Sequence, residues 1–316
     1  MTQPLLYISN LRSYFHQAKA VDGVDLQVLS GEIIGIVGES GSGKSVMALS
    51  VLGLLPKPGE IVSGRILFEG HDLVTYTESQ LQSIRGSRIG MVFQEPMTAL
   101  NPVLTIADQV TEPLRLHRKM TRKHAWAASA ELLQAVGLNE PNRLARRYPH
   151  ELSGGMRQRV LIAMALSCDP ALVIADEPTS ALDAIIANTV LKRLLDTSQD
   201  HGAAVMFITH DLRLAARSCK SITVMYAGSV METSRGRDIL TSPAHPYTEG
   251  LVGSLPRADR SAPLRPITGS APSPSALPEG CPFHPRCPRV FEPCFREKPP
   301  LFHAGPSRTA RCWLYA

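Results

Sequence analysis

The feature that most constrains this chain is a glycine-rich run between an apolar segment and a predicted helix. The run reads Gly38-Glu39-Ser40-Gly41-Ser42-Gly43-Lys44-Ser45. It fits the pattern G-x-x-x-x-G-K-[S/T], in which closely wrapped backbone N–H groups surround a polyphosphate. The apolar residues 33–37 before it are typical of a buried strand in a parallel sheet, and residues 46–52 after it favour a helix. The sequence therefore predicts a strand, a phosphate-binding loop and a helix.

We expect two side chains of this run to bind a nucleotide and its metal. Lys44 would reach the β- and γ-phosphates, and Ser45 would hold Mg²⁺. The alternative is an ordinary glycine-rich turn followed by a chance Lys-Ser pair. The strand before the run and the helix after it favour the phosphate loop, because the N-terminus of a helix attracts anions.

A second apolar segment, residues 171–175, ends in two acids, Asp176 and Glu177. A carboxylate at the end of such a strand is where a phosphate-loop enzyme holds its metal. Asp176 is therefore the candidate Mg²⁺ ligand, and Glu177 is the candidate base that polarises the attacking water. The two acids could instead cap a turn, because Pro178 follows. The phosphate loop upstream makes the catalytic interpretation the better one.

A third motif, Leu152-Ser153-Gly154-Gly155, precedes an apolar-periodic segment that predicts a helix over 156–167. Ser153 suits the N-cap position, and the start of the helix would present N–H groups to an anion. By itself the motif would be only a helix cap. At about a hundred residues after a phosphate loop, it resembles the signature of the ATP-binding-cassette (ABC) family.

The resemblance to ABC ATPases implies a fold and an activity. It implies an α/β fold, with a P-loop nucleotide-binding core built from residues 1–93 and about 166–240 as a parallel sheet. A helical subdomain at about 95–165 would carry the signature. Two cassettes would face each other head to tail, so that ATP on one lies against the signature of the other, and the activity would be ATP hydrolysis with Mg²⁺.

The same resemblance assigns roles to further residues. Gln94, after the apolar residues 89–93, would be the Q-loop glutamine that contacts Mg²⁺ and water, and His210, after residues 205–209, would be the switch histidine that acts beside Glu177. An aromatic side chain would stack on adenine: Phe15 by its position, with Tyr14 as the alternative.

The resemblance assigns the remaining roles to groups of residues. The ATP-binding set would be Phe15, Gly38, Glu39, Ser40, Gly41, Ser42, Gly43, Lys44, Ser45, Val46 and Gln94. The residues that contact ATP on the facing subunit would be Ser153, Gly154, Gly155 and Gln158, and the D-loop would be Ser180, Ala181, Leu182 and Asp183.

Three segments, residues 93–102, 245–248 and 254–256, are similar to the dipeptide/oligopeptide importer ATPases within the ABC family. This implies a subunit that couples ATP binding and hydrolysis to peptide uptake. Its partners would be two membrane permeases, a second ABC ATPase and an extracytoplasmic substrate-binding protein. A nickel or metal-chelate importer remains an alternative, as does a soluble ABC ATPase of DNA repair or translation.

Composition agrees with a peripheral subunit at the cytoplasmic face of the inner membrane. The chain has 316 residues, of which 44% are hydrophobic, and this suffices for one large α/β core and an appendage. No apolar run approaches the roughly 20 residues that span a bilayer, and residues 1–10 lack the pattern of a signal peptide. We therefore expect membrane association only through partners.

The C-terminal part differs in composition, and we expect domains at 1–254 and 255–316. Of the 25 prolines, 13 lie between Pro256 and Pro306, and residues 270–278 are typical of a linker. Residues 255–316 hold nine Lys and Arg against four acids, so they carry the whole net charge of +5. They lack the charge runs and interleaved aromatics of a nucleic-acid site, so we expect no nucleic-acid partner.

Four of the six cysteines lie in this tail: Cys281, Cys287, Cys294 and Cys312. The tail is too short and proline-rich to fold on a hydrophobic core alone, and thiols in the cytosol stay reduced, so a metal is the expected staple. Structural zinc favours C-x2–4-C pairs, which are absent here, whereas iron–sulfur ligation tolerates wider spacing. The spacing also resembles the tail of dipeptide-permease ATPases, which implies a 4Fe-4S cluster. Zinc and plain reduced thiols remain alternatives.

Overall fold

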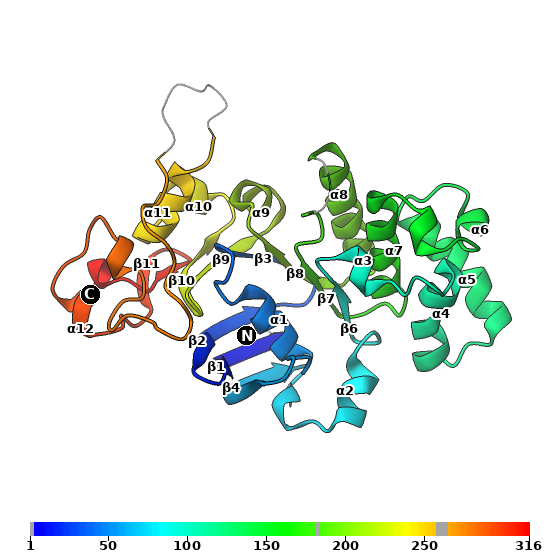
Figure 1. The fold of residues 1–316 in the computed structure, drawn as a ribbon, viewed down its shortest axis with the longest axis horizontal. Coiled ribbons are helices and arrows are strands. Elements are labelled where there is room, and N and C mark those ends of the chain that lie inside the picture. Colours follow the sequence, from blue (N-terminus) through cyan, green and yellow to red (C-terminus); the bar gives the residue numbers. More distant parts are fainter. Residues whose placement is uncertain (1–2, 181, 183, 257–264) are drawn as a thin grey trace. The chain divides into compact units, whose positions relative to one another are not determined.

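The computed structural model describes residues 3–256 and 265–316 except 181 and 183. The chain divides into two compact units (Figure 1). Unit 1 comprises residues 1–5, 28–33 and 75–208, and unit 2 comprises residues 6–27, 34–74 and 209–316.

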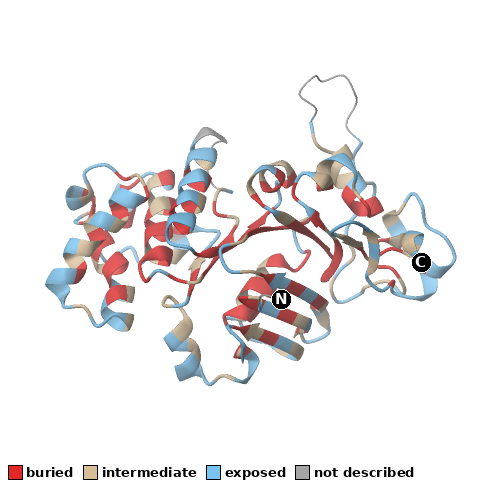
Figure 2. Cartoon of the chain, turned by 180° about the vertical axis from the view of Figure 1, so that it is seen from behind, coloured by how far each residue is buried: buried red, intermediate tan, exposed pale blue. Residues whose placement is uncertain are grey.

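Unit 1 has a parallel sheet of β6 (Ile89–Val92), β7 (Leu172–Asp176) and β8 (Ala204–Thr209). The register pairs Ile89 with Leu172, and Leu172 with Ala204. All residues of β7 and β8 are buried, as Figure 2 shows in red. Continuous apolar runs of this kind suit strands that are covered on both faces. The three strands predicted from the sequence are therefore confirmed, with bounds that differ by one residue.

The helices of unit 1 mostly come between β6 and β7 in the sequence. They are α2 (Glu78–Ile84), α3 (Pro96–Ala99), α4 (Ile106–His117), α5 (Arg122–Ala135), α6 (Pro141–Leu144) and α7 (Gly154–Leu166), with α8 (Ala184–Asp200) after β7. A 3-10 turn, η2 (Pro149–Glu151), precedes α7. The side chains of Thr105 and Thr121 accept N–H groups at the starts of α4 and α5, which satisfies donors that a helix leaves unpaired. Leu114, Ala125 and Cys168 form one buried cluster between these helices.

Unit 2 contains an antiparallel sheet with the strand order β2-β1-β4-β5. Its strands are β1 (Leu6–Phe15), β2 (Ala18–Val28), β4 (Gly59–Phe68) and β5 (His71–Asp72), and η1 (Leu73–Thr75) follows. The prediction of a single parallel sheet from residues 1–93 is therefore wrong for these strands. The alternation of buried and exposed residues along β1 explains the difference, because antiparallel sheets with one solvated face show this pattern.

A second group of strands in unit 2 has the order β3-β9-β10-β12-β11. These strands are β3 (Ile33–Val37), β9 (Ser221–Tyr226), β10 (Ser229–Arg235), β11 (Phe302–Gly305) and β12 (Arg308–Ala310). β3 and β9 are parallel, whereas β9, β10, β12 and β11 pair antiparallel. The C-terminal hairpin thus extends the strands that follow the phosphate loop.

The other elements of unit 2 are short. They are α1 (Lys44–Val51), α9 (Leu212–Ser218), α10 (Asp238–Thr241), α11 (Pro246–Gly253), η3 (His284–Arg286), α12 (Pro293–Arg296) and η4 (Trp313–Tyr315). Phe283 is buried and packs edge-on against Tyr226 and beside Tyr247, with centroid distances of 5.3 Å in both cases. The tail therefore buries its aromatic side chain on α11 and β9 rather than in a core of its own. The domain limits 1–254 and 255–316 remain a prediction.

In the part of the chain that the structure describes, none of the helices combines the length and the apolar character that a bilayer span requires.

Candidate nucleotide-binding site

The phosphate loop begins where β3 ends, and its glycines are required by close contacts. A Cβ on Gly38 would lie 2.2 Å from the Met225 carbonyl oxygen. Gly43 has φ +99°, and a Cβ there would lie 2.3 Å from the Ala20 carbonyl oxygen. Gly41 also has a positive φ, of +77°. Larger residues would be strained or would clash at these positions, so the loop conformation depends on glycine.

Lys44 is the first residue of α1, and it folds back over the loop. Its Nζ donates to the carbonyl oxygens of Gly38 and Glu39, both at 2.9 Å, and to Ser42 Oγ at 3.2 Å. Lys44 is buried, whereas Ser45 and Val46 are partly exposed at the start of α1. The ammonium group is thus held inside the loop, and its charge there favours an anionic ligand.

Tyr14 and Phe15, the two candidates for stacking on adenine, differ in their contacts. The Tyr14 hydroxyl donates to Asp22 Oδ1 at 2.9 Å. Burial first, and then this hydrogen bond, raise the pKa of Tyr14 to about 12. Phe15 pairs with Gly59 across β1 and β4, and a Cβ on Gly59 would meet the Phe15 ring at 2.5 Å. The absence of a side chain at Gly59 therefore makes room for the ring, which is only partly buried.

The acidic pair of unit 1 ends β7, as predicted. Asp176 is buried, and its backbone pairs with Ile208 of β8. Glu177 has φ +43°, a left-handed conformation that is unusual for a non-glycine residue and is often found at functional sites. Its N–H donates to the Ile208 carbonyl at 2.9 Å, which fixes the turn. Gln94 Nε2 donates to Glu177 Oε2 at 3.2 Å, so the structure brings these two predicted residues together.

Helix α7, which carries the predicted signature, begins at Gly154, two residues before the predicted start at 156. Ser153 is the N-cap and accepts the Met156 N–H at 3.4 Å. Ser153 and Gly154 are exposed, whereas Gly155 is buried, and a Cβ on Gly155 would lie 2.8 Å from Ile186 Cγ2 of α8. The exposed start of α7 leaves its N–H groups accessible to an anion.

Gln158 does not fit its predicted contact with ATP on a facing subunit. Its side chain is only 2% exposed, because it lies on a buried face of α7. Nε2 has no hydrogen-bond partner among the described residues. Sequence motifs do not reveal which side of a helix is buried, and here the burial argues against the predicted role.

The D-loop residues follow Glu177 closely. Ser180 donates from its N–H and its Oγ to the Glu177 carbonyl, both at 3.2 Å. Leu182 lies 3.7 Å from the position of a Cβ on Gly154, so this segment packs against the start of α7. Ala181 and Asp183 lie outside the described residues.

His210 follows β8 directly and is exposed. The next residue, Asp211, caps α9 by accepting the N–H groups of Arg213 and Leu214. The candidate residues thus fall into two sets. Unit 1 holds Gln94, Asp176, Glu177 and the signature, and unit 2 holds the phosphate loop, Phe15 and His210.

Two residues that contact the phosphate loop carried no assigned role in the sequence. The Tyr247 hydroxyl accepts the Glu39 N–H at 3.0 Å, and Arg286 pairs with the Glu39 carboxylate at 2.8 Å. Tyr247 had appeared only within a segment similar to peptide importers, and Arg286 only as one of nine basic residues in the tail. No local pattern could have joined them to Glu39, because they lie more than 200 residues away along the chain.

None of the four tail cysteines forms a disulfide, and three of them are buried: Cys281, Cys294 and Cys312. Burial first, and the neighbouring thiols Cys294, Cys312 and Cys287 in addition, raise the pKa of Cys281 to about 12. The Cys281 N–H donates to the Cys294 carbonyl at 2.9 Å, so these two cysteines are neighbours in the fold. Among the described residues, no three His, Cys, Asp or Glu side chains form a site for a single metal ion. Cys168 and Cys219 are buried as well.

Comparison with known protein families shows which family this chain belongs to. The ABC transporter family matches residues 21–180, and the oligopeptide/dipeptide transporter C-terminal region matches residues 231–294. The chain belongs to the ABC transporter ATPases. It is therefore an ATP hydrolase of the ABC type, and it carries the C-terminal region of the oligopeptide/dipeptide group.

Its relatives match along almost their whole length. The chain is 47% identical to the oligopeptide transport ATP-binding protein AppD of Bacillus subtilis, over 98% of this chain and 97% of that protein. It is 43% identical to the dipeptide transport ATP-binding protein DppD of the same organism, over 99% and 95%. It is 42% identical to the oligopeptide transport ATP-binding protein OppD of Salmonella typhimurium, over 98% and 93%.

Solved structures confirm the α/β ABC ATPase fold. The dimeric cassette MJ0796, determined with ADP and phosphate after hydrolysis, aligns with a TM-score of 0.66 and 30% identity, covering 73% of this chain and 99% of that one. The protein cbiO1 of Clostridium perfringens aligns with a TM-score of 0.66 and 25% identity, covering 76% and 92%. These alignments leave about a quarter of this chain uncovered.

Proposed function

We propose that this ATPase energises the uptake of dipeptides or oligopeptides as a subunit of an ABC importer. The observation that carries the proposal is the match to peptide-transport ATP-binding proteins over 98–99% of the chain, which includes the tail. The C-terminal region matches the oligopeptide/dipeptide group as well. A soluble ABC ATPase of repair or translation accounts for neither match. A nickel importer is a weaker alternative, because these relatives are peptide-transport proteins.

The residues act together when two cassettes close around ATP. Lys44 would bind the β- and γ-phosphates, and Ser45, Gln94 and Asp176 would hold Mg²⁺, whose charge would offset the negative charge that develops during phosphoryl transfer. Glu177 orients the attacking water and takes up its proton, and Gln94, whose amide donates to Glu177, keeps this carboxylate in place.

Closure requires the second subunit. The start of α7, capped by Ser153, contacts the γ-phosphate of the ATP bound to the facing cassette, whereas His210 contacts the γ-phosphate of the ATP bound to its own cassette. ATP binds the closed state more tightly than the open state, so hydrolysis shifts the population back to the open state. Two permeases convert this motion into transport, and an extracytoplasmic binding protein delivers the peptide. The ATPase lies at the cytoplasmic face of the membrane.

The transport proposal is tested by purifying the tagged chain from detergent-solubilised membranes and identifying the co-purifying proteins. We expect two multi-span permeases and a second ABC ATPase, and a binding protein whose affinity for dipeptides or oligopeptides exceeds its affinity for nickel chelates. Recovery with DNA-repair or ribosomal proteins would refute the importer, and a preference for nickel chelates would refute the peptide substrate.

We further propose that the tail cysteines hold a 4Fe-4S cluster. Its support is the burial of Cys281, Cys294 and Cys312, the partial exposure of Cys287, and the Cys281 N–H that donates to the Cys294 carbonyl at 2.9 Å. Four thiolates around a cluster form a negative centre, which Arg289 beside Cys287 and Cys312 would offset. A bound cluster would covalently join the segments that carry its ligands.

Iron and acid-labile sulfide in the anaerobically purified chain test the cluster. We expect about four of each per chain, from the composition of such clusters, and their loss in Cys281→Ser. The control Cys168→Ser removes a buried cysteine elsewhere and should keep the iron. One zinc per chain without sulfide would refute the cluster, and a metal-free chain would do the same.

A further inference from the structure

Glu39, the second residue of the phosphate loop, is held by three other residues of unit 2. Its N–H donates to the Tyr247 hydroxyl at 3.0 Å, and its carbonyl oxygen accepts Lys44 Nζ at 2.9 Å. Its carboxylate accepts hydrogen bonds from both terminal nitrogens of Arg286, with N···O distances of 2.8 and 3.1 Å. Every polar group of Glu39 is therefore engaged, and one of its partners is the lysine that faces the phosphates.

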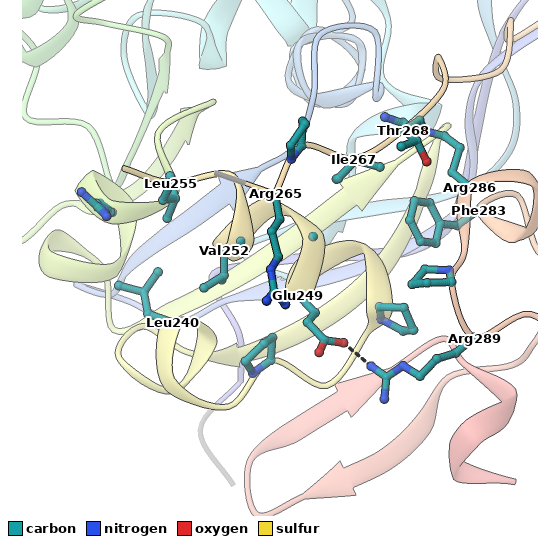
Figure 3. A pocket seen from close by; sticks show the side chains of 17 residues that line it. Leu240, Glu249, Val252, Leu255, Arg265, Ile267, Thr268, Phe283, Arg286 and Arg289 are labelled. Carbon is teal, nitrogen blue, oxygen red and sulfur yellow. Dashed lines mark hydrogen bonds and ion pairs between the residues drawn. The ribbon is translucent and has the colours of Figure 1, made fainter. Parts of the chain in front are cut away.

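The Arg286 side chain is itself fixed. It is 6% exposed, whereas the Glu39 side chain is 30% exposed. Its Nε donates to the Thr268 carbonyl at 3.0 Å, and its guanidinium lies 5.7 Å from the centre of the Tyr226 ring. Figure 3 shows Arg286 beside Thr268 and above Phe283. A planar guanidinium with a bidentate carboxylate partner has a defined orientation, which a lysine cannot reproduce.

The backbone that carries Arg286 is a short turn within the cysteine segment. η3 begins after Phe283 and ends at Arg286, one residue before Cys287. The N–H of Arg286 donates to the Phe283 carbonyl, and Phe283 is buried against Tyr226 and Tyr247. The same aromatic group therefore positions both side chains that reach Glu39, namely Tyr247 and Arg286.

We propose that Arg286 is a positioning residue of the ATP site, which acts through Glu39 on Lys44 of the same chain. The ion pair holds the Glu39 peptide where its carbonyl can accept Lys44, and it neutralises a carboxylate that would otherwise repel the triphosphate. Like charges repel more strongly in a partly buried site than in water, because the effective dielectric constant is lower. The C-terminal region thereby becomes part of the machinery that binds nucleotide.

The test measures the binding of a fluorescent ATP analogue with Mg²⁺ to the full-length chain. In Arg286→Gln we expect the dissociation constant to rise about tenfold, which corresponds to about 1.4 kcal/mol. In Arg286→Lys, which keeps the charge but cannot reproduce the planar bidentate pair, we expect an intermediate value. The melting temperature without nucleotide is recorded for each variant, and the Lys variant carries the test if the Gln variant unfolds. Unchanged affinity in both variants would overturn the proposal.

The matched control is Arg296→Gln in the same tail. Arg296 pairs with Glu292 at 2.6 Å on an exposed surface, with both side chains more than 60% accessible. We expect wild-type affinity for the analogue in this variant. A loss equal to that of Arg286→Gln would show that any change in the tail weakens binding, and it would refute a specific role of Arg286.

A double variant tests whether Arg286 acts through Glu39. Glu39→Gln removes the carboxylate, but its amide oxygen can still accept one N–H of Arg286, so we expect a smaller loss of affinity than in Arg286→Gln. In the double variant Glu39→Gln/Arg286→Gln no unpaired carboxylate remains, so we expect binding at least as tight as in Arg286→Gln alone. If the two losses multiply instead, Arg286 acts by a route that does not include Glu39, and the proposal fails.

Discussion

Lowering the pH should destabilise this protein because His245 is buried in its neutral form. His245 caps α11: its Nδ1 accepts the Tyr247 N–H at 3.0 Å, which an imidazolium cannot do. Burial lowers the pKa of His245 from 6.5 to about 3. The positive charge of Arg289 adds to this shift. The folded state therefore keeps a neutral ring down to low pH.

The sign and size of the effect follow from proton linkage. Between the folded pKa, about 3, and the unfolded pKa, 6.5, the unfolded chain binds a proton that the folded chain does not. The stability contribution is thus complete above pH 6.5 and declines as the pH falls. Between pH 7.5 and pH 5.5 the free energy of unfolding should decrease by about 1.3 kcal/mol from this group alone, at 1.36 kcal/mol per pKa unit.

Urea unfolding at both pH values measures this decrease, and His245→Asn provides the comparison. Asparagine can accept the same N–H at an N-cap but does not titrate. We expect the variant to be less stable than the wild type at pH 7.5 and to lose about 1.3 kcal/mol less between the two pH values. Parallel pH profiles for the two proteins would refute the argument that a neutral His245 sets this dependence.

Three further outcomes are expected. Glu177→Gln should lower ATP turnover of the assembled importer by at least roughly a hundredfold, as the loss of a general base does. Its affinity for ATP should be unchanged, and retained turnover would refute the role of Glu177. Gly43→Ala should lower the melting temperature of the nucleotide-free chain more than Gly41→Ala. Both glycines have positive φ, but only at Gly43 would the added Cβ lie 2.3 Å from a carbonyl oxygen. Equal losses would contradict the steric argument. Ser153→Ala should cost about 1 kcal/mol of stability through the lost cap of α7, measured by urea unfolding; no loss would show that the 3.4 Å contact contributes nothing.

The sequence predicted those parts of the fold whose signals are local. The apolar run of residues 33–37 and the glycines after it specify a strand and a loop within a dozen residues, and both occur at the expected places. The acids after β7 and the cap Ser153 were found for the same reason.

The parts that could not be predicted depend on tertiary contacts. The resemblance to the ABC family implied a contact of Gln158 with ATP, but a motif does not show which sides of α7 are buried, and the Gln158 side chain is buried. The antiparallel sheet of β1 and β4 depends on pairing between residues about 50 positions apart, which apolar runs alone do not specify. The contact of Arg286 with Glu39 joins residues 247 positions apart, and single-sequence patterns carry no information at that range.

The contact between Arg286 and Glu39 also bears on the order in which the protein is made. A ribosome synthesises the phosphate loop early, whereas Tyr247 and Arg286 emerge more than 200 residues later. At a synthesis rate of about 5–20 residues per second, the loop exists for roughly 10–50 s without these partners. Because the loop acquires its last contacts only when the tail arrives, a nascent or truncated chain ending near residue 254 lacks the arrangement that the finished chain offers to ATP. The tail thus delays full nucleotide binding until synthesis is nearly complete.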